Sequence, residues 1–499
     1  MTQTVAPERS MQEIINPATG EVIATVPAHT REETAEAFVR ARRAQRRWVK
    51  TSFRQRRKIF LTFHNLVIDH RERLMDTIQD ENGKNRLSAL EEILDVAMTA
   101  RHYAYRAEKL LKPVSRRSVV PLWTSTKEER APKGVVGAIA PFNYPLSLAV
   151  SDAIPAILAG NSVVVKPDSQ TPLSALLAAE LLAEAGLPEG VYNVVTGRGS
   201  EVGQAIVEEC DYLMFTGSTE TGRLLAEQVA PRLIDYSMEL GGKNALIIAD
   251  DADIDRAVSE IWPACFSNSG QLCISIERMY VHRAVADEFI PAFVDKVKGL
   301  KVAGGHGWDA DMGSLISVEH ADKVEAFVDD AVAKGATVLA GGRRLRELGE
   351  AFYAPTVLTG VPESADLYRG EVFGPVVYIE IVDSNDEAIR RANDTDYGLN
   401  SSVWAKPSTG KKIASQLQTG TVNINEGYAP AWSSMDAPMG GFKTSGVGRR
   451  HGDGGLTKYT ESRNVTQTRV MNVVNNRVRS EVWADLLPTT LRIGRDILR

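Results

Sequence analysis

The sequence predicts an α/β protein in which a doubly wound parallel sheet is joined to a second α/β domain. From residue 134 onward, short apolar runs alternate with amphipathic helical segments, as in a parallel sheet covered by helices on both faces. The alternation resumes after KNALIIAD (243–250) with a new set of strands and helices. A chain of 499 residues is also longer than one compact core allows, so two or three domains are expected.

The N-terminal third predicts helices. Residues 30–49 begin with Thr-x-x-Glu and place apolar residues at helical spacing, which indicates a capped amphipathic helix. Residues 59–84 and 88–111 show the same spacing and are expected to end near Gly83 and before Pro113.

The centre of the chain predicts the strands of the first sheet and the helices between them. The expected strands are GVVGAIA (134–140), NSVVVKP (161–167), VYNVVTG (191–197) and YLMFTG (212–217). The expected helices are 146–160, ending in a glycine, and 171–186. In the second domain, helices are expected at 287–300 and 321–336, and strands at 336–342 and 375–382.

Composition argues against several classes of protein. The net charge of −6, without a basic run, gives no footprint for nucleic acid. Three cysteines without a CxxC pair, and histidines without HExxH, favour neither a disulfide framework nor a metal site. The most apolar stretch (134–160) carries three prolines, so no membrane span is expected, and the first residues resemble no secretion signal. A cytoplasmic protein without a membrane or nucleic-acid partner is expected.

Two polar segments follow strands of the predicted sheet. In FTGSTETGR (215–223), Gly217 and Ser218 open a helix whose free N–H groups and dipole favour an anion such as a phosphate. An ordinary capped turn is the commoner interpretation of that segment alone. In VVVKPDSQTP (163–172), Lys166 stands at a strand end, where it could contact ribose hydroxyls or be a solvated surface charge. Two such segments in one sheet favour a dinucleotide.

Three residues are candidates for the chemistry. Cys210 and Cys265 sit in apolar surroundings and fit the usual buried cysteine, whereas Cys273 ends a small polar loop that could present its sulfur to a cleft. Glu239 ends an apolar segment before a Gly-Gly turn, where burial should raise its pKa and suit it as a general base. Asn143 lies on a strand-to-helix turn with its amide free to donate. A helix-end glutamate and a turn asparagine are also common without any function.

Six short motifs occur in a fixed order along the chain. They are PFNYP (141–145), VVVKPDSQTP, FTGSTETG, MELGGKN (238–244), GQLC (270–273) and EVFGPV (371–376). Together they resemble the aldehyde dehydrogenase superfamily over roughly residues 12–465. Within it, FSNSGQLCISIER (266–278) and APMGGF (437–442) are most similar to NADP-dependent succinate-semialdehyde dehydrogenases.

The resemblance implies a role for each candidate. Cys273 would attack the aldehyde, and the Asn143 side chain with the Cys273 N–H would hold the oxyanion. Hydride would pass to a nicotinamide, and Glu239 would activate the water that releases the acid. The cofactor-binding residues implied are Phe142, Lys166, Pro167, Asp168, Ser169, Gly217, Ser218, Leu240, Glu371 and Phe373.

The cofactor and the substrate are inferred from departures within the motifs. Ser169 stands where NAD-preferring relatives often carry a glutamate, so NADP is expected, with NAD possible. Ser151 stands where typical succinate-semialdehyde enzymes place an arginine, so a substrate carboxylate would be met from elsewhere, for example by a basic side chain in 427–443. Alternatively, an aromatic or aliphatic tunnel would be lined by Tyr144, Leu148, Tyr428 and Trp432. Ser275 replaces a second cysteine of some relatives, so no disulfide on Cys273 is expected.

The resemblance also implies how the domains are arranged and which other functions remain open. Residues 1–113 and 133–240 would bind the cofactor, 241–441 would form the catalytic domain, and 114–132 with 454–499 an oligomerisation arm and tail. The arm predicts a homo-dimer or homo-tetramer, since its strands would leave unpaired edges in a monomer. Oxidation of broad aliphatic or aromatic aldehydes is the first alternative function. A CoA-acylating enzyme or an idle structural member is disfavoured by Glu239 and by the presence of all three candidates.

Overall fold

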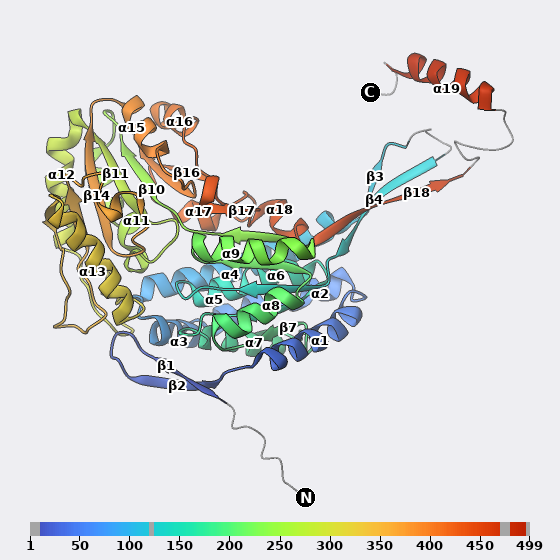
Figure 1. The fold of residues 1–499 in the computed structure, drawn as a ribbon, viewed down its shortest axis with the longest axis horizontal. Coiled ribbons are helices and arrows are strands. Elements are labelled where there is room, and N and C mark those ends of the chain that lie inside the picture. The colour runs from blue at the N-terminus through green and yellow to red at the C-terminus, as the bar shows by residue number, and fades with distance from the viewer. Residues whose placement is uncertain (1–9, 119–123, 470–479, 496–499) are drawn as a thin grey trace, which may run out of the picture. The chain divides into compact units, whose positions relative to one another are not determined.

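A computed structural model describes residues 10–118, 124–469 and 480–495. Two compact units divide the chain, one over Met1–Leu110 and Pro132–Thr460 and the other over Leu111–Ala131 and Glu461–Arg499. Figure 1 labels many of the elements of both units and colours the chain from blue at the N-terminus to red at the C-terminus. The first unit contains both large sheets and all the candidate site residues.

The N-terminal helices follow the sequence pattern closely, with one break. They are α1 Arg31–Trp48, α2 Phe53–Asp69, α3 Arg71–Asn82 and α4 Arg86–Leu111. The Thr30 side chain and the Glu33 side chain form the predicted capping box of α1. The prediction of a single helix over 59–84 is wrong, because the chain turns at His70 between α2 and α3. The end of α3 is as predicted, with Gly83 in the left-handed conformation.

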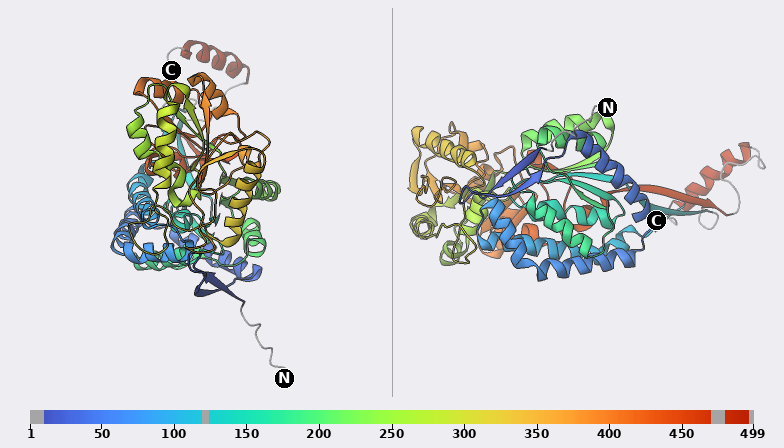
Figure 2. Two further views of the ribbon diagram at one scale, coloured as in Figure 1. Left: turned by 90° about the vertical axis from the view of Figure 1, so that its left-hand side faces the viewer. Right: turned by 90° about the horizontal axis from the view of Figure 1, so that it is seen from below.

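A β-hairpin that the sequence analysis did not predict precedes these helices. It pairs β1 Met11–Ile15 with β2 Val22–Pro27 in antiparallel register and is dark blue in Figure 2. The Gln12 side chain donates to the Ser169 carbonyl. The hairpin therefore fastens the start of the chain to the loop after a strand of the first sheet.

The first sheet has six strands in the order β17-β9-β8-β5-β6-β7. They are β17 Gly446–Val447, β9 Asp235–Glu239, β8 Tyr212–Thr216, β5 Val135–Ile139, β6 Ser162–Lys166 and β7 Tyr192–Val194. All neighbours are parallel except β17, which runs antiparallel to β9. The doubly wound prediction is confirmed, and β17 shows that the chain returns to this sheet after completing the second one.

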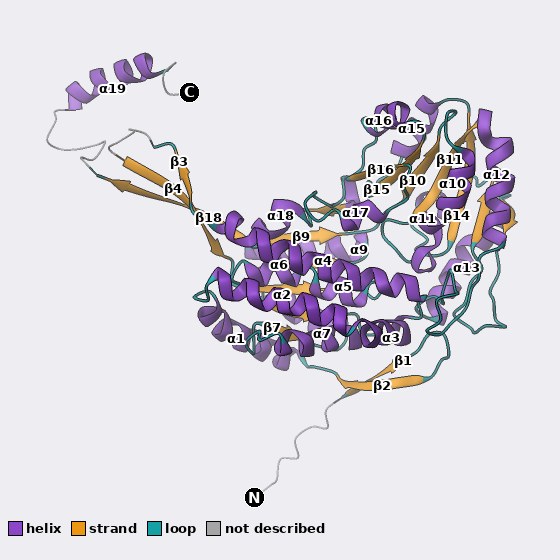
Figure 3. Cartoon of the chain, turned by 180° about the vertical axis from the view of Figure 1, so that it is seen from behind, coloured by secondary structure: helices purple, strands orange, loops and turns teal. Residues whose placement is uncertain are grey.

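Helices alternate with these strands, as the purple and orange ribbons of Figure 3 show. They are α5 Pro145–Val150, α6 Ala153–Leu158, α7 Leu173–Glu184, the π-helical turn η1 Gly199–Gly203, α8 Gln204–Glu209, α9 Thr219–Val229 and the turn η2 Ala230–Arg232. The predicted single helix over 146–160 is instead two short helices, α5 and α6, separated at Ser151 and Asp152. Both of these polar residues are buried.

The second sheet has seven strands in the order β12-β13-β14-β11-β10-β15-β16. They are β12 Thr337–Ala340, β13 Thr356–Thr359, β14 Val376–Val382, β11 Ile276–His282, β10 Asn244–Ile248, β15 Asn400–Trp404 and β16 Thr421–Ile424. The accompanying helices and turns are α10 Ile254–Glu260, α11 Trp262–Phe266, η3 Ser267–Gly270, α12 Arg283–Lys298, α13 Val318–Ala333, α14 Asp366–Arg369, α15 Asn385–Asn393, α16 Pro407–Ala414, α17 Ala429–Ser433, η4 Lys443–Ser445 and α18 Gly452–Thr457.

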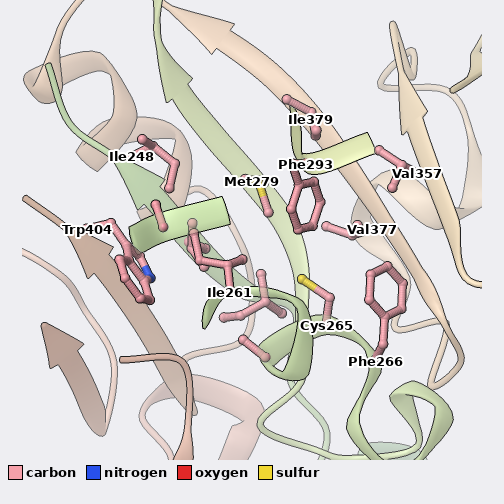
Figure 4. Close-up of a cluster of buried hydrophobic side chains, with 14 of the residues drawn as sticks. Ile248, Ile261, Cys265, Phe266, Met279, Phe293, Val357, Val377, Ile379 and Trp404 are labelled. Carbon is pink, nitrogen blue, oxygen red and sulfur yellow. The ribbon is translucent and has the colours of Figure 1, made fainter. Parts of the chain in front are cut away.

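The core beneath the second sheet packs α10–α12 against its central strands. Figure 4 shows Phe266 and Cys265 beside Met279 of β11 and Phe293 of α12. Each is inaccessible to solvent, and burying such a side chain contributes roughly 1.5–3 kcal/mol. Cys265 is thus a core residue, as predicted, and the cluster anchors the start of the loop that leads to Cys273.

The second unit is a three-stranded antiparallel sheet followed by a helix. Its strands are β3 Val114–Arg116, β4 Thr124–Pro132 and β18 Thr460–Thr468, in the order β18-β4-β3, and its helix is α19 Ser480–Gly494. Arg116 pairs with Glu128, and Arg463 pairs with Glu129 at 2.9 Å. Within the arm expected at 114–132, β3 and β4 pair as an antiparallel hairpin on both sides of its tip. The tip (119–123) and the tail residues 470–479 and 496–499 lie outside the described residues. In the part of the chain that is described, no helix has both the length and the apolarity needed to cross a membrane.

Gly270→Ala tests how tightly the loop that ends at Cys273 packs against the turn before β14. Gly270 has φ +71°, and an added Cβ would lie 2.0 Å from the Gly374 carbonyl oxygen. We expect the free energy of unfolding to fall by at least about 1–3 kcal/mol, because the loop ending at Cys273 would be pushed off the turn before β14. The thermal midpoint followed by circular dichroism measures this.

Gly186→Ala is the matched control. Its φ is +93°, but an added Cβ meets nothing within 4 Å. Only the left-handed strain of about 1–2 kcal/mol should remain. Equal midpoint shifts for the two variants would contradict the close contact at Gly270.

Candidate active site

A cavity of about 730 Å³ opens at the carboxyl ends of β5, β6, β8 and β9, where open parallel sheets bind ligands. All but one of the predicted site residues line it. These are Phe142, Asn143, Lys166, Asp168, Ser169, Gly217, Ser218, Glu239, Leu240, Cys273, Glu371 and Phe373. The exception is Pro167, which does not line the cavity and whose carbonyl accepts a 2.9 Å hydrogen bond from the Lys166 ammonium group.

One wall of the cavity is the N-terminus of α9. Ser218 is the N-cap, and its Oγ accepts from the Thr221 N–H at 3.2 Å. The first N–H groups of such a helix have no acceptor within the helix, which favours an anion there. Gly217 has no room for a side chain, because an added Cβ would lie 2.5 Å from the Phe215 ring. The predicted anion turn thus has the required local structure.

A second part of the wall follows β6. Lys166 is buried, and this burial lowers the pKa of its ammonium group, while the nearby Asp168 carboxylate raises it. Asp168 itself accepts from the Gln170 N–H at 2.9 Å, so its carboxylate is turned into its own loop. Ser169, one residue on, is half-buried at the cavity edge.

Cys273 ends the loop after η3 and lines two cavities at once. One is the large cavity and the other has a volume of about 50 Å³. Asn143, on the turn between β5 and α5, lines both as well, and its amide donates to the Gln271 carbonyl at 3.0 Å. The Asn143 amide is therefore not wholly free, as it was predicted to be. One of its N–H groups is bonded to Gln271, which fixes the direction of the other.

The surroundings of the Cys273 thiol favour its neutral form. Burial, together with the nearby Glu371 and Glu239 side chains, raises its pKa to about 12, while Arg450 opposes them. The segment 266–278 contains no histidine, and the histidines that line the two cavities, His320 and His451, come from other parts of the chain. The local structure thus shows a shielded thiol.

Glu239 ends β9 and faces the same cavity. Its Oε1 is buried and has no hydrogen-bond partner among the described residues. Burial raises the pKa of the carboxyl to about 8, against the lowering effect of Arg450 and Lys458. The predicted direction of the shift is correct, and such a group can exchange protons near neutral pH.

Hydrogen bonds to neighbouring segments fix the turn that carries Glu371 and Phe373. Glu371 accepts from the Gly242 N–H at 2.8 Å. Phe373 has φ +53°, and its N–H donates to the Glu277 carboxylate at 3.0 Å. Glu277 in turn pairs with buried Lys243 at 2.6 Å. The Lys243–Glu277 pair thus stabilises the strained backbone of Phe373, and neither member of the pair was predicted from the sequence.

The smaller cavity corrects two expectations about substrate binding. Tyr144, Leu148 and Trp432 line it, but Tyr428 lies behind it and its hydroxyl donates to Glu91. The basic side chain of the loop 427–443 is Lys443, which instead donates to the backbone carbonyls of residues 393 and 395.

The basic residues that line the smaller cavity are Arg450 and His451, just beyond that loop. The sequence analysis missed both. Nothing in GVGRRHG (446–452) distinguishes a buried arginine from a surface one, and only the antiparallel bridge between Met439 and Arg450 brings the segment to the cavity.

Comparison with known proteins agrees with this geometry. The model of the aldehyde dehydrogenase family matches residues 4–465. A protein of Mycolicibacterium smegmatis provisionally named succinate-semialdehyde dehydrogenase (NADP+) is 55% identical over 456 residues, covering 91% of this chain and 88% of the relative. A similarly named protein of Mycobacterium ulcerans is 50% identical over 468 residues, covering 94% and 90%.

A solved structure gives the same result for the fold. The betaine aldehyde dehydrogenase of Staphylococcus aureus, in complex with NAD+, superposes with a TM-score of 0.88 at 36% identity, covering 94% of each chain. The predicted fold and the predicted resemblance are both confirmed. The chain belongs to the aldehyde dehydrogenase family.

Proposed function

We propose that the protein oxidises an aldehyde to its carboxylic acid with NADP, with Cys273 as the nucleophile. One observation carries the proposal: Cys273 and Asn143 form the wall shared by the large cavity and the small one. An aldehyde in the small cavity whose carbonyl carbon reaches the Cys273 sulfur would therefore lie next to a cofactor in the large cavity. Glu239 faces the large cavity from the end of β9.

The chain's own residues supply the steps of acyl chemistry. The Cys273 sulfur bonds to the aldehyde carbon, and the oxygen that becomes negative accepts from the Asn143 amide and the Cys273 N–H. Removing one such donor costs about 2.7–4 kcal/mol in comparable reactions. A nicotinamide cofactor held by the residues of the large cavity would supply the hydride acceptor. The Glu239 carboxylate then takes a proton from the water that attacks the thioester on Cys273 and releases the acid.

The residues of the large cavity fit a dinucleotide. The N-terminus of α9 suits a diphosphate, and the buried Lys166 offers a cation and hydrogen-bond donors at the carboxyl end of β6. Glu371, which lines the cavity from the turn before β14, would accept a hydrogen bond from a ribose hydroxyl, as the family resemblance implies. The cavity volume of about 730 Å³ is within the range of cofactor sites.

NADP is proposed over NAD because of Ser169. A glutamate there would repel a 2′-phosphate, whereas a serine can donate to it. The names of the two mycobacterial relatives include NADP, which supports the choice. Succinic semialdehyde is the proposed substrate on the strength of the same names.

The domain and subunit roles are also proposals. The first sheet would carry the cofactor and the second the loop with Cys273. The antiparallel sheet of β18, β4 and β3 leaves β3 and β18 as its edges, so we propose that this sheet pairs with another subunit in a dimer or tetramer.

An assay that follows NADP reduction by the absorbance of the reduced nicotinamide, with a panel of aldehydes, tests the proposed reaction. We expect turnover of succinic semialdehyde with water as the final acceptor and no requirement for CoA. Cys273→Ala should lose turnover by at least about 1,000-fold while NADP still binds, because the sulfur forms the covalent bond. Undiminished turnover by Cys273→Ala would falsify the mechanism.

Glu239→Gln should separate hydride transfer from hydrolysis. We expect a burst of about one reduced cofactor per site, then a steady state lowered by about 100-fold or more, because the thioester accumulates. Rapid mixing and acid quench measure both phases.

The pH dependence checks the same residue. The active form of Glu239 is the carboxylate, and its pKa is raised to about 8, so hydrolysis should speed up as pH rises through about 8 and slow below it. Glu239→Gln should lack this rise; an unchanged profile would remove Glu239 from its role.

Ser169→Glu should reverse the cofactor preference. The added carboxylate would face a 2′-phosphate, and we expect kcat/KM with NADP to fall by about 100-fold while that with NAD holds or improves. Gln170→Glu is the control, because it adds the same charge on the exposed neighbouring residue, which does not line the large cavity. Equal effects from both variants would mean that Ser169 does not contact the phosphate.

A further inference from the structure

We propose that Arg450 and His451 bind the far carboxylate of the aldehyde substrate inside the smaller cavity. The proposal rests on the proposed function and names the residues that give it selectivity. It answers the question raised by Ser151, which stands where an arginine clamp was expected. The arginine reaches the cavity from the C-terminal segment instead.

Both residues share the cavity with the reacting atoms. Arg450, His451, Cys273 and Asn143 all line it. Its apolar walls are Leu148, Leu272, Ile274, Trp432 and Met439. A volume of about 50 Å³ holds about four water-sized groups, since each needs roughly 10–15 Å³. That suits a short chain ending in a carboxylate better than a bulky aromatic ring.

Arg450 is a buried cation with unused donors. Its side chain is 9% exposed, and its Nε lies 3.2 Å from an Asp152 carboxylate oxygen. The Lys458 ammonium group lies 3.6 Å from the other oxygen of Asp152, so one carboxylate faces two cations. Among the described residues the buried Nε of Arg450 makes no hydrogen bond, although the guanidinium carries five N–H donors. A planar fork of this kind matches a carboxylate.

His451 is unpartnered in the same way. It is 4% exposed, and neither ring nitrogen has a hydrogen-bond partner among the described residues. Burial lowers the pKa of the ring to about 3, so it is neutral and has one N–H to donate. A buried donor without an acceptor is unfavourable unless a ligand supplies one.

The backbone holds the two side chains in place. His451 has φ +56°, a conformation that residues other than glycine rarely adopt. Arg450 and Met439 exchange backbone hydrogen bonds of 2.7 and 2.9 Å, and the Gly452 N–H donates to the Met435 carbonyl at 2.8 Å. The segment is therefore rigid on both sides of the strained residue, as a preorganised binding site requires.

The acidic groups of the cavity wall are already occupied. The Glu91 carboxylate accepts from the Tyr144 and Tyr428 hydroxyls. The Asp95 carboxylate accepts from the Ser147 and Ser151 hydroxyls. Burial also raises the pKa of both carboxyl groups, and the nearby Arg450 lowers that of Asp95 in part. Ser151 thus serves Asp95, and Arg450 is left as the cation with free donors toward an anion.

The test is the carboxylate selectivity, defined as kcat/KM for succinic semialdehyde divided by kcat/KM for butanal. The wild-type ratio should be about 100 or more, because a site built for a polar group rejects the analogue that lacks it. Arg450→Met should lower the ratio by at least about 30-fold, mainly through KM. Arg450→Lys should retain part of it, and His451→Phe should lose less than Arg450→Met.

Two further variants exclude a purely structural effect. The double variant Asp152→Asn/Arg450→Gln removes both charges of the buried pair together, which avoids leaving an unpaired carboxylate, and should lower the ratio as Arg450→Met does. Lys458→Met also removes a cation from Asp152, but Lys458 does not line the smaller cavity. The carboxylate selectivity of this variant should therefore equal that of the wild type.

The possible results separate the two proposals. If the wild type fails to reduce NADP with any of the aldehydes, the proposed function is refuted. A wild type that prefers the semialdehyde, with variants that keep the ratio, overturns only the role of Arg450 and His451. Parallel losses on both aldehydes, an equal loss of the ratio in Lys458→Met, or a wild-type ratio near 1 would overturn it as well.

Discussion

The buried ion pair between Lys84 and Glu92 fixes the turn on which the site is built. The two charged atoms are 2.7 Å apart, and both side chains are fully inaccessible to solvent. Lys84 also donates to the Asn143 carbonyl at 2.6 Å, while Glu92 accepts from the first N–H groups of α5. Burying two charges costs several kcal/mol per ion unless each is paired and hydrogen-bonded, and here both are. Since α4 carries Glu92, the N-terminal helices hold Asn143 in position as well as covering the sheet.

The network continues from this turn into the loop of Cys273. The Asn268 amide donates to the carbonyls of Asn143 and Gln271, at 2.9 and 3.0 Å. Asn268 has φ +50°, a strain of order 1–3 kcal/mol that the surrounding hydrogen bonds must hold. On the other side, the Asn244 amide donates to the Cys273 carbonyl at 2.8 Å. The loop of Cys273 is therefore hydrogen-bonded both to the turn after β5 and to the start of β10, so the Cys273 backbone and the Asn143 side chain are held in one geometry.

Features that depend on residues close together in the sequence could be predicted from it, whereas features that depend on residues far apart in the chain could not. The capping box at Thr30, the N-cap at Ser218 and the strand ends at Lys166 and Glu239 are local patterns, and the structure has them where they were predicted. The break at His70 was missed because the apolar spacing continues across it. Arg450 was missed because its burial depends on Asp152, about three hundred residues away in the chain, and on the return of the chain to the first sheet through β17. Its role could not be inferred from the local sequence.

The electrostatics of the large cavity set an order for the proposed reaction. Burial raises the pKa of the Cys273 thiol to about 12 and those of Glu239 and Glu371 to about 8. Because Glu239 is the weaker base, it takes the thiol proton unfavourably while the cavity holds only these acidic neighbours. A positive charge beside the sulfur would lower the pKa of the thiol, and an oxidised nicotinamide ring held in the cavity that Cys273 lines would supply such a charge. The thiolate should therefore form only once the cofactor is in place, so that the aldehyde is captured when a hydride acceptor is present, and the sulfur otherwise stays protonated and unreactive.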